Sequence, residues 1–195
     1  MKLYKNRIGI GALHFGNIVS KEISYDIIRK AFSNGISFID TSPLYGNTFS
    51  EKIVGSVIKD FPRNKMTIAS KVGLKKKISN GQWGVEIMRL NKKNIIASVD
   101  RSLKNLNTDY LDLLQLHAFD KETSIDETFE CLERLTTQGK ILSVGVSNYN
   151  PSEMRKVLKN EISKNISYCQ IHYNIFERKA ELELLPLLKK NKITP

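Results

Sequence analysis

Polar side chains suited to acid–base or hydrogen-bonding chemistry stand at the ends of short apolar runs in this chain. Asp40, Lys71 and His117 each end one such run, and the pair Ser147 and Asn148 ends a fourth. The runs read as buried strands, in which a charged residue at the tip serves no packing purpose. Polar groups at the carboxyl ends of successive parallel strands are where α/β barrels carry their active sites. The spacing therefore predicts one site built from four strand ends.

A tyrosine completes a set of groups that can move a proton. Tyr45 lies in the loop after Asp40, on the same expected rim as Lys71 and His117. A free phenol has a pKa near 10 and exchanges protons poorly at neutral pH, but a neighbouring ammonium lowers that pKa and a carboxylate holds the ammonium in place. A histidine can orient a carbonyl group. Such a set can protonate a carbonyl oxygen while hydride reaches the carbon.

The elements that would hold these residues alternate between strand and helix. Helices are expected after the first strand, with Ser24 as the cap, after the second strand, with Ser50 as the cap, and from Asn91 onward. Pro151 is expected in the first turn of a fifth helix, and the last helix is expected over 179–190. The long connection 72–90 holds a segment, 75–83, that forms either a substrate wall or a surface insertion. The predicted strands are 7–11, 37–40, 66–71, 111–117, 142–147 and 167–171, and 193–195 reads as the start of a seventh.

This alternation predicts one α/β domain over residues 1–195 with parallel strands and right-handed crossovers. Six strand–helix units are present, whereas a closed (β/α)8 barrel has eight and about 250 residues. We therefore expect a TIM-type barrel of which about six units lie in this chain, incomplete at the C-terminus.

Composition narrows the function classes. The chain has 195 residues, 41% of them hydrophobic, and a net charge of +11. Lysines supply most of the charge and are spread along the chain, so a solvated basic surface is expected rather than a nucleic-acid site. The expected location is the cytoplasm without membrane contact, because no apolar run reaches the length of a span and the N-terminus lacks a secretory signal. Cys131 and Cys169 read as buried thiols, and we expect no metal site.

Five motifs carry a family resemblance that covers essentially the whole chain. In order and spacing they resemble the signatures of the aldo-keto reductases. The motifs are GISFIDTSPLYG at 35–46 with Ser50 and Glu51, IASKVG at 68–73, TDYLDLLQLH at 108–117, GKILSVGVSNY at 139–149 and QIHYN at 170–174.

The resemblance implies an NADPH-dependent oxidoreductase, with NADH as the alternative cofactor, that acts on an aldehyde, ketone or sugar carbonyl. By position it implies that Tyr45 is the general acid or base, that Lys71 lowers its pKa, that Asp40 pairs with Lys71, and that His117 orients the carbonyl. The residues implied at the cofactor are Gly11, Ala12, Leu13, Asp40, Ser147, Asn148 and Gln170.

The chain departs from the family pattern after residue 195, where the family carries two further strands and the segments that hold the cofactor phosphates. Three explanations stay open: a partial record of a longer enzyme, a natural truncation, or a chain whose open barrel edge associates with a partner. The alternative function is a catalytically inactive barrel that serves as an interaction or regulatory module, or a non-functional fragment. The substrate is a small carbonyl compound or sugar that the sequence does not define further.

Overall fold

The sheet at the centre of the molecule is parallel and has the strand order β1-β2-β3-β6-β7-β8. The computed structural model describes residues 8–195, the side chain of Lys164 excepted, so Arg7 of the predicted first strand lies outside the described residues. Every residue of β3, β6 and β7 is buried, which is typical of parallel strands covered on both faces. The strands are β1 (Ile10–Gly11), β2 (Phe38–Asp40), β3 (Thr67–Val72), β6 (Leu113–Leu116), β7 (Val144–Ser147) and β8 (Ile166–Gln170).

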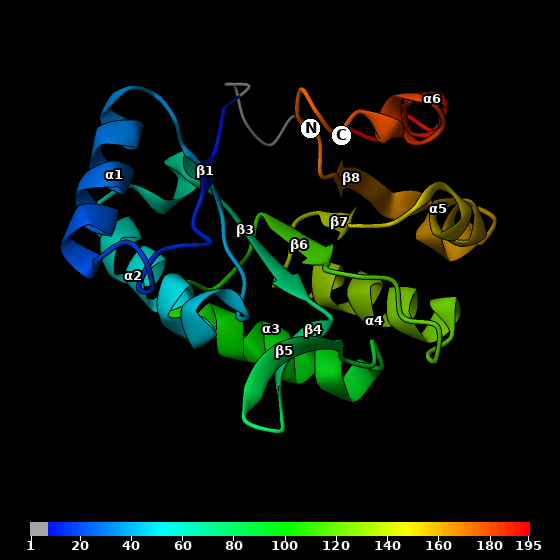
Figure 1. Ribbon diagram of the computed structural model, residues 1–195, viewed down its shortest axis with the longest axis horizontal. Helices are drawn as coiled ribbons and strands as arrows, with labels where there is room; N and C mark the ends of the chain where they lie inside the picture. Colours follow the sequence, from blue (N-terminus) through cyan, green and yellow to red (C-terminus); the bar gives the residue numbers. More distant parts are fainter. Residues whose placement is uncertain (1–7) are drawn as a thin grey trace.

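Helices form an arc around the outside of this sheet (Figure 1). Their inward faces supply the core, for example Ile28 of the first helix, Ile95 and Val99 of the third, and Leu132 of the fourth, all buried. Among residues 8–195, no helix is both long and apolar enough to cross a membrane. The helices are α1 (Lys21–Ser33), α2 (Phe49–Ile58), α3 (Lys92–Leu106), α4 (Ile125–Thr137), α5 (Pro151–Leu158) and α6 (Leu184–Lys190), and the 3-10 turns are η1 (Tyr45–Thr48), η2 (Arg63–Lys65), η3 (Glu161–Asn165) and η4 (Lys179–Glu181).

The arrangement is the expected one: an α/β fold with the strands and outer helices of a TIM-type barrel, of which six strands lie in this chain. Side chains on alternate strand positions point to the inside of the curved sheet. The register pairs Lys71 with Gln115 and Ser147 with Gln170, so polar residues of neighbouring strands lie at the same level. The start of a seventh strand is also confirmed, because Thr194 bridges Tyr168 in parallel.

Two of the predicted helix starts are wrong. The N-cap of α1 is Ser20, four residues before the predicted Ser24, whose buried hydroxyl instead donates to the carbonyl oxygen of Ser20 at 2.7 Å. The residue before α2 is Thr48 in a left-handed conformation, and the predicted cap Ser50 lies inside the helix and donates to the Ala12 carbonyl. In both cases the serine hydroxyl donates a hydrogen bond to a backbone carbonyl instead of capping the helix.

The other predicted helix boundaries agree better. Asn91 caps α3, and Asn150 caps α5 with Pro151 in its first turn. The last predicted helix, 179–190, is divided into η4 and the shorter α6.

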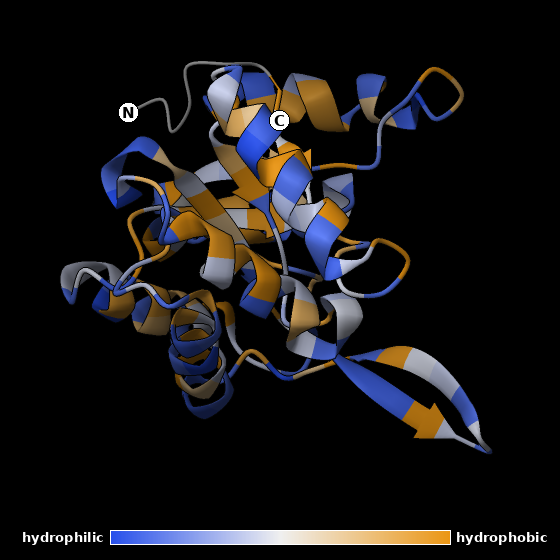
Figure 2. Ribbon diagram, turned by 90° about the vertical axis from the view of Figure 1, so that its left-hand side faces the viewer, coloured by the Kyte–Doolittle hydropathy of each residue, from blue (hydrophilic) through white to orange (hydrophobic). Residues whose placement is uncertain are grey.

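The connection 72–90 is not a plain loop but an antiparallel hairpin of β4 (Leu74–Ser79) and β5 (Gln82–Ile87). The hairpin projects from the body of the molecule in Figure 2. Its turn is Asn80–Gly81, both with positive φ, and an Asn-Gly pair between strands is the strongest short hairpin signal in a sequence. The sequence contained that signal, and it was missed.

Candidate active site

An ion pair between the ends of β2 and β3 forms the centre of the site. Both carboxylate oxygens of Asp40 lie 2.6 Å from the ammonium nitrogen of Lys71. The Lys71 side chain is completely buried, and it also donates to the Thr41 carbonyl at 3.3 Å. Burial lowers the pKa of Lys71, and the charge of Asp40 opposes that shift. Asp40 and Lys71 therefore form a buried ion pair whose two charges are held in fixed positions.

Two amide side chains also donate to the Asp40 carboxylate. Gln115 donates to one oxygen at 3.1 Å and Gln170 to the other at 3.2 Å. A buried carboxylate needs such donors, because its desolvation is costly. Sequence reasoning missed Gln115, although it precedes His117 by two residues and so shares its side of a strand.

Tyr45 lies beside this pair, in η1 just after β2. The Lys71 ammonium is 5.0 Å from the centre of the Tyr45 ring. That Lys71 favours the phenolate form of Tyr45 stays a prediction. Burial raises the pKa of Tyr45 well above its usual value, and the negative charge of Asp40 adds to that shift. The phenol is therefore protonated at neutral pH, which is the form that donates a proton.

His117 reaches the same space from the end of β6. Its ring is edge-on to that of Tyr45, with centroids 6.0 Å apart, and its Nδ1 lies 3.4 Å from the Ser42 hydroxyl. Burial lowers the pKa of His117 to about 3, and the positive charge of Lys71 acts in the same direction. The imidazole is thus neutral at pH 7 and can donate one hydrogen bond without adding charge.

The second predicted group, Ser147, Asn148 and Gln170, lies at the ends of β7 and β8. Asn148 donates to the Ser147 hydroxyl at 3.1 Å and to the His117 carbonyl at 3.0 Å. The Ser147 hydroxyl donates to the side-chain oxygen of Gln170 at 3.3 Å. Since Gln170 also binds Asp40, this group and the Tyr45 side of the site form one hydrogen-bonded network.

Two of the three residues predicted at the end of the first strand contact the backbone of Asp40. Gly11 pairs with Asp40 in the sheet, and the backbone N–H of Ala12 donates to the Asp40 carbonyl at 2.9 Å. Ala12 is fully buried, whereas Leu13 is half exposed. The Ala12 backbone therefore helps to fix Asp40, and Gly11 and Leu13, which are both exposed, are the members of the three that a ligand can reach.

The donor set fits a nicotinamide carboxamide, which needs both hydrogen-bond donors and acceptors. Ser147, Asn148 and Gln170 offer a hydroxyl and two amides at one end of the sheet. Within residues 8–195 there is no cluster of three or more His, Cys, Asp or Glu side chains that could hold a metal ion.

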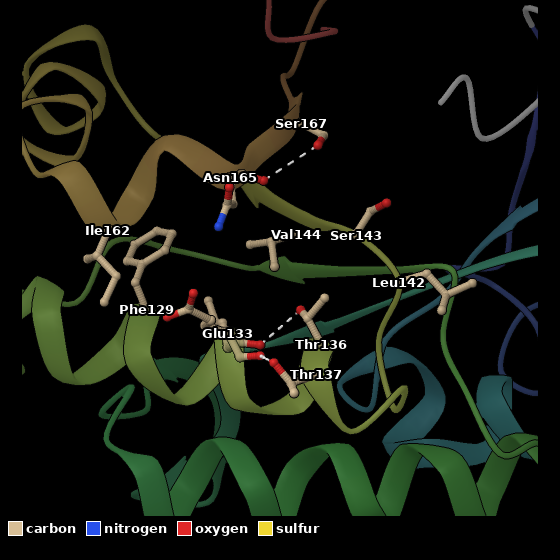
Figure 3. A pocket seen from close by; sticks show the side chains of 11 residues that line it. Phe129, Glu133, Thr136, Thr137, Leu142, Ser143, Val144, Ile162, Asn165 and Ser167 are labelled. Atoms are coloured by element: carbon tan, nitrogen blue, oxygen red, sulfur yellow. Dashed lines mark hydrogen bonds between the residues drawn. The ribbon is translucent and has the colours of Figure 1, made fainter.

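A separate groove of about 420 Å³ lies between α4, η3 and the beginning of β7. Figure 3 shows Phe129 and Thr136 of α4 on one side and Val144 of β7 on another. The Thr136 and Thr137 hydroxyls donate to carbonyls of their own helix. The groove lies at the amino ends of the strands, away from Tyr45 and His117, and holds no group suited to acid–base chemistry apart from Glu133.

The sequence pattern of the aldo/keto reductase family matches residues 7–195. The chain belongs to that family. It is 38% identical to the aldo-keto reductase YhdN of Bacillus subtilis over 194 residues, which is 97% of this chain and 56% of YhdN. It thus spans slightly more than half the length of this relative.

Solved structures give the same picture. The glycerol dehydrogenase AKR11B4 from Gluconobacter oxydans is 32% identical, with a TM-score of 0.85 over 96% of this chain and 57% of that one. An aldo/keto reductase from Klebsiella pneumoniae in complex with NADP and acetate is 26% identical, with a TM-score of 0.82 over 95% of this chain and 60% of that one.

Proposed function

We propose that the protein containing this chain reduces an aldehyde, ketone or sugar carbonyl to an alcohol, or catalyses the reverse oxidation, in the cytoplasm. The observation that carries the proposal is the contact of Lys71 with both Asp40 oxygens beside the Tyr45 ring. A phenol beside a fixed ammonium supports the assignment of Tyr45 as the proton donor to a carbonyl oxygen.

Each residue has one role in this proposal. Tyr45 donates its phenolic proton to the carbonyl oxygen as the alkoxide forms. Lys71 stabilises the phenolate that Tyr45 leaves behind, and Asp40 keeps Lys71 in position. Neutral His117 donates a hydrogen bond to the same carbonyl oxygen and sets its direction. A bound nicotinamide cofactor supplies the hydride.

The cofactor's carboxamide would be held by Ser147, Asn148 and Gln170, and the strand end formed by Gly11, Ala12 and Leu13 would lie beside the cofactor or substrate. We propose NADPH as the usual cofactor, supported by the NADP complex of the Klebsiella pneumoniae relative. NADH is the alternative, because the NADH-specific methylglyoxal reductase of Escherichia coli is 31% identical to this chain. We further propose that residues 1–195 form one domain that holds the reacting end of the cofactor.

The experiment uses the complete product of the gene that encodes this chain, together with residues 1–195 alone. NADPH or NADH is mixed with a panel of small aldehydes and sugars, and cofactor oxidation is followed by absorbance. We expect carbonyl-dependent oxidation by the complete product and weak NADPH binding, measured by nicotinamide fluorescence, for residues 1–195 alone. Absence of oxidation with every carbonyl and both cofactors would contradict the proposal.

A further inference from the structure

The β4–β5 hairpin has two chemically different faces. Strand pairing places Lys75, Lys77 and Glu86 on one face, and Glu86 forms ion pairs with both lysines at 2.8 and 3.4 Å. By alternation, Lys76 and Trp83 lie on the other face. No carboxylate of the described residues lies within 4 Å of the Lys76 ammonium. Lys76, the middle lysine of the run, is therefore the one whose ammonium can bind a negatively charged ligand.

Lys76 and Trp83 border a hollow of about 350 Å³ between the hairpin and the loops after β1 and β2. Leu44 and Gly46, the two neighbours of Tyr45 in the chain, line the same hollow. Its volume lies within the range of about 300 to 1,000 Å³ that small-molecule sites occupy. The hollow therefore adjoins the proposed proton donor and is large enough for part of a substrate.

Two glycines that line the hollow have closely packed neighbours. A side chain at Gly46 would come within 3.1 Å of the Phe15 carbonyl oxygen, and one at Gly16 within 2.9 Å of Ile53. Both glycines also have positive φ, 54° and 74°, which other residues rarely adopt. A side chain at either glycine would therefore be strained, and Lys76 and Trp83 supply the side chains of the hairpin wall.

The lining favours a negatively charged ligand with a flat apolar body. It consists of one ammonium from Lys76, two side-chain amides from Asn17 and Asn47, an indole from Trp83, Leu44 and two glycines, with no carboxylate among them. Trp83 is 74% exposed, which is unusual for an indole that has no binding role. An indole face stacks on flat rings, and an ammonium attracts an anion.

We propose that this hollow is a substrate-recognition subsite for an anionic aromatic group, with Trp83 stacking on the ring and Lys76 binding its carboxylate. The inference rests on the proposed function in that the group recognised is part of the carbonyl substrate. The preferred substrates would then be aromatic aldehydes or ketones that carry a carboxylate away from the reacting carbonyl.

The test uses the only tryptophan of the chain, Trp83, as its own reporter. Purified residues 1–195 are titrated with benzoate and with neutral benzamide while tryptophan fluorescence is recorded. We expect saturable quenching by benzoate that weakens with added salt, and at least about fivefold weaker binding of benzamide. Equal binding of the two compounds, or no binding of benzoate, would overturn the proposal.

Lys76→Gln and Lys77→Gln form the matched pair of variants, because each removes one charge from the same strand but from opposite faces. Lys76→Gln should weaken benzoate binding about fivefold, and Lys77→Gln should leave it within about twofold. Equal effects of the two substitutions would show that benzoate responds only to total charge, and the proposal would fail. These titrations measure binding and not catalysis. Their result therefore remains valid even if the proposed reductase activity is not found.

The complete gene product gives an independent measurement. The ratio of kcat/KM for 4-carboxybenzaldehyde to that for its methyl ester should fall about fivefold in Lys76→Gln and stay unchanged in Lys77→Gln. A ratio unaffected by Lys76→Gln would contradict the assignment of the subsite to substrate recognition. Inactivity of the gene product toward both aldehydes would count against the proposed function and leave the fluorescence result in force.

Discussion

The ammonium of Lys71 lies 2.6 Å from both carboxylate oxygens of Asp40, and its side chain has no exposed surface. The same carboxylate accepts from Gln115 and Gln170, so one buried anion connects β2, β3, β6 and β8. This contact links stability to chemistry, because the groups that hold the charge in place also form the proposed active site.

Asp40→Asn should destabilise the protein strongly. Removing one partner of a buried ion pair leaves the other charge uncompensated, which costs about 3 kcal/mol or more of unfolding free energy. Asp60→Asn is the matched control, because Asp60 pairs with Arg29 at the surface and its loss should cost less than about 1 kcal/mol. Urea denaturation measures both, and similar losses for the two variants would refute the role given to burial.

Gln115→Leu should remove one donor from the Asp40 carboxylate while keeping the side-chain size. The expected loss of unfolding free energy is about 1 to 2 kcal/mol, the usual effect of leaving a buried acceptor short of one hydrogen bond. Gln138→Leu, at an exposed position after α4, should change stability by less than about 0.5 kcal/mol. If chemical denaturation gives equal midpoints for the two variants, Gln115 has no such role.

Stability should depend on pH through His117. The pKa of His117 is lowered to about 3 in the folded state, whereas an unfolded histidine has a pKa near 6.5. Between these values the unfolded chain binds more protons, so the unfolding free energy falls as the pH decreases, and it is unaffected above the upper value. From pH 6.5 to about pH 5 the loss should be about 2 kcal/mol.

His117→Gln provides the comparison, since the other two histidines of the chain, His14 and His172, remain. The unfolding free energy of the wild type minus that of the variant should decrease as the pH falls from 6.5 to 5. Above pH 7 this difference should not change with pH. A difference that does not vary between pH 5 and 7 would mean that His117 is not held neutral by the fold.

Gly55→Ala should disturb the contact between α2 and α3. A methyl group at Gly55 would meet the Asn105 carbonyl oxygen at 2.4 Å and Leu106 backbone atoms at 2.7 Å. Overpacking of this kind costs about 1 to 3 kcal/mol. Gly84 in the hairpin has open space around it, so Gly84→Ala should leave stability unchanged. Equal melting temperatures of the two variants in thermal unfolding would contradict the predicted contact.

The sequence was sufficient for most of the fold because strand and helix periods alternate regularly. It also placed Asp40, Lys71 and His117 correctly at strand ends, since that position follows from the length of each apolar run. Gln115 was missed because it lies inside such a run, where only the direction of the side chain reveals its role. The pKa of Tyr45 depends on burial, which no local pattern records.

The hairpin is a different kind of omission. The Asn80–Gly81 pair indicated a hairpin turn. The three successive lysines before it and the low apolar content of the segment favoured a solvated loop instead. Strand pairing, rather than composition, separates Lys76 from Lys75 and Lys77. The faces of a hairpin could have been assigned from the Asn-Gly turn alone.

The most direct test of the account is the turnover of Tyr45→Phe in the complete gene product, measured as carbonyl-dependent NADPH oxidation. Tyr25→Phe is the control, because it removes a phenol that bonds to Ser56 on the outer helices. The account predicts that kcat falls roughly 100-fold or more in Tyr45→Phe, with NADPH affinity unchanged, and stays near wild type in Tyr25→Phe. A kcat for Tyr45→Phe within about twofold of wild type would contradict Tyr45 as the proton donor.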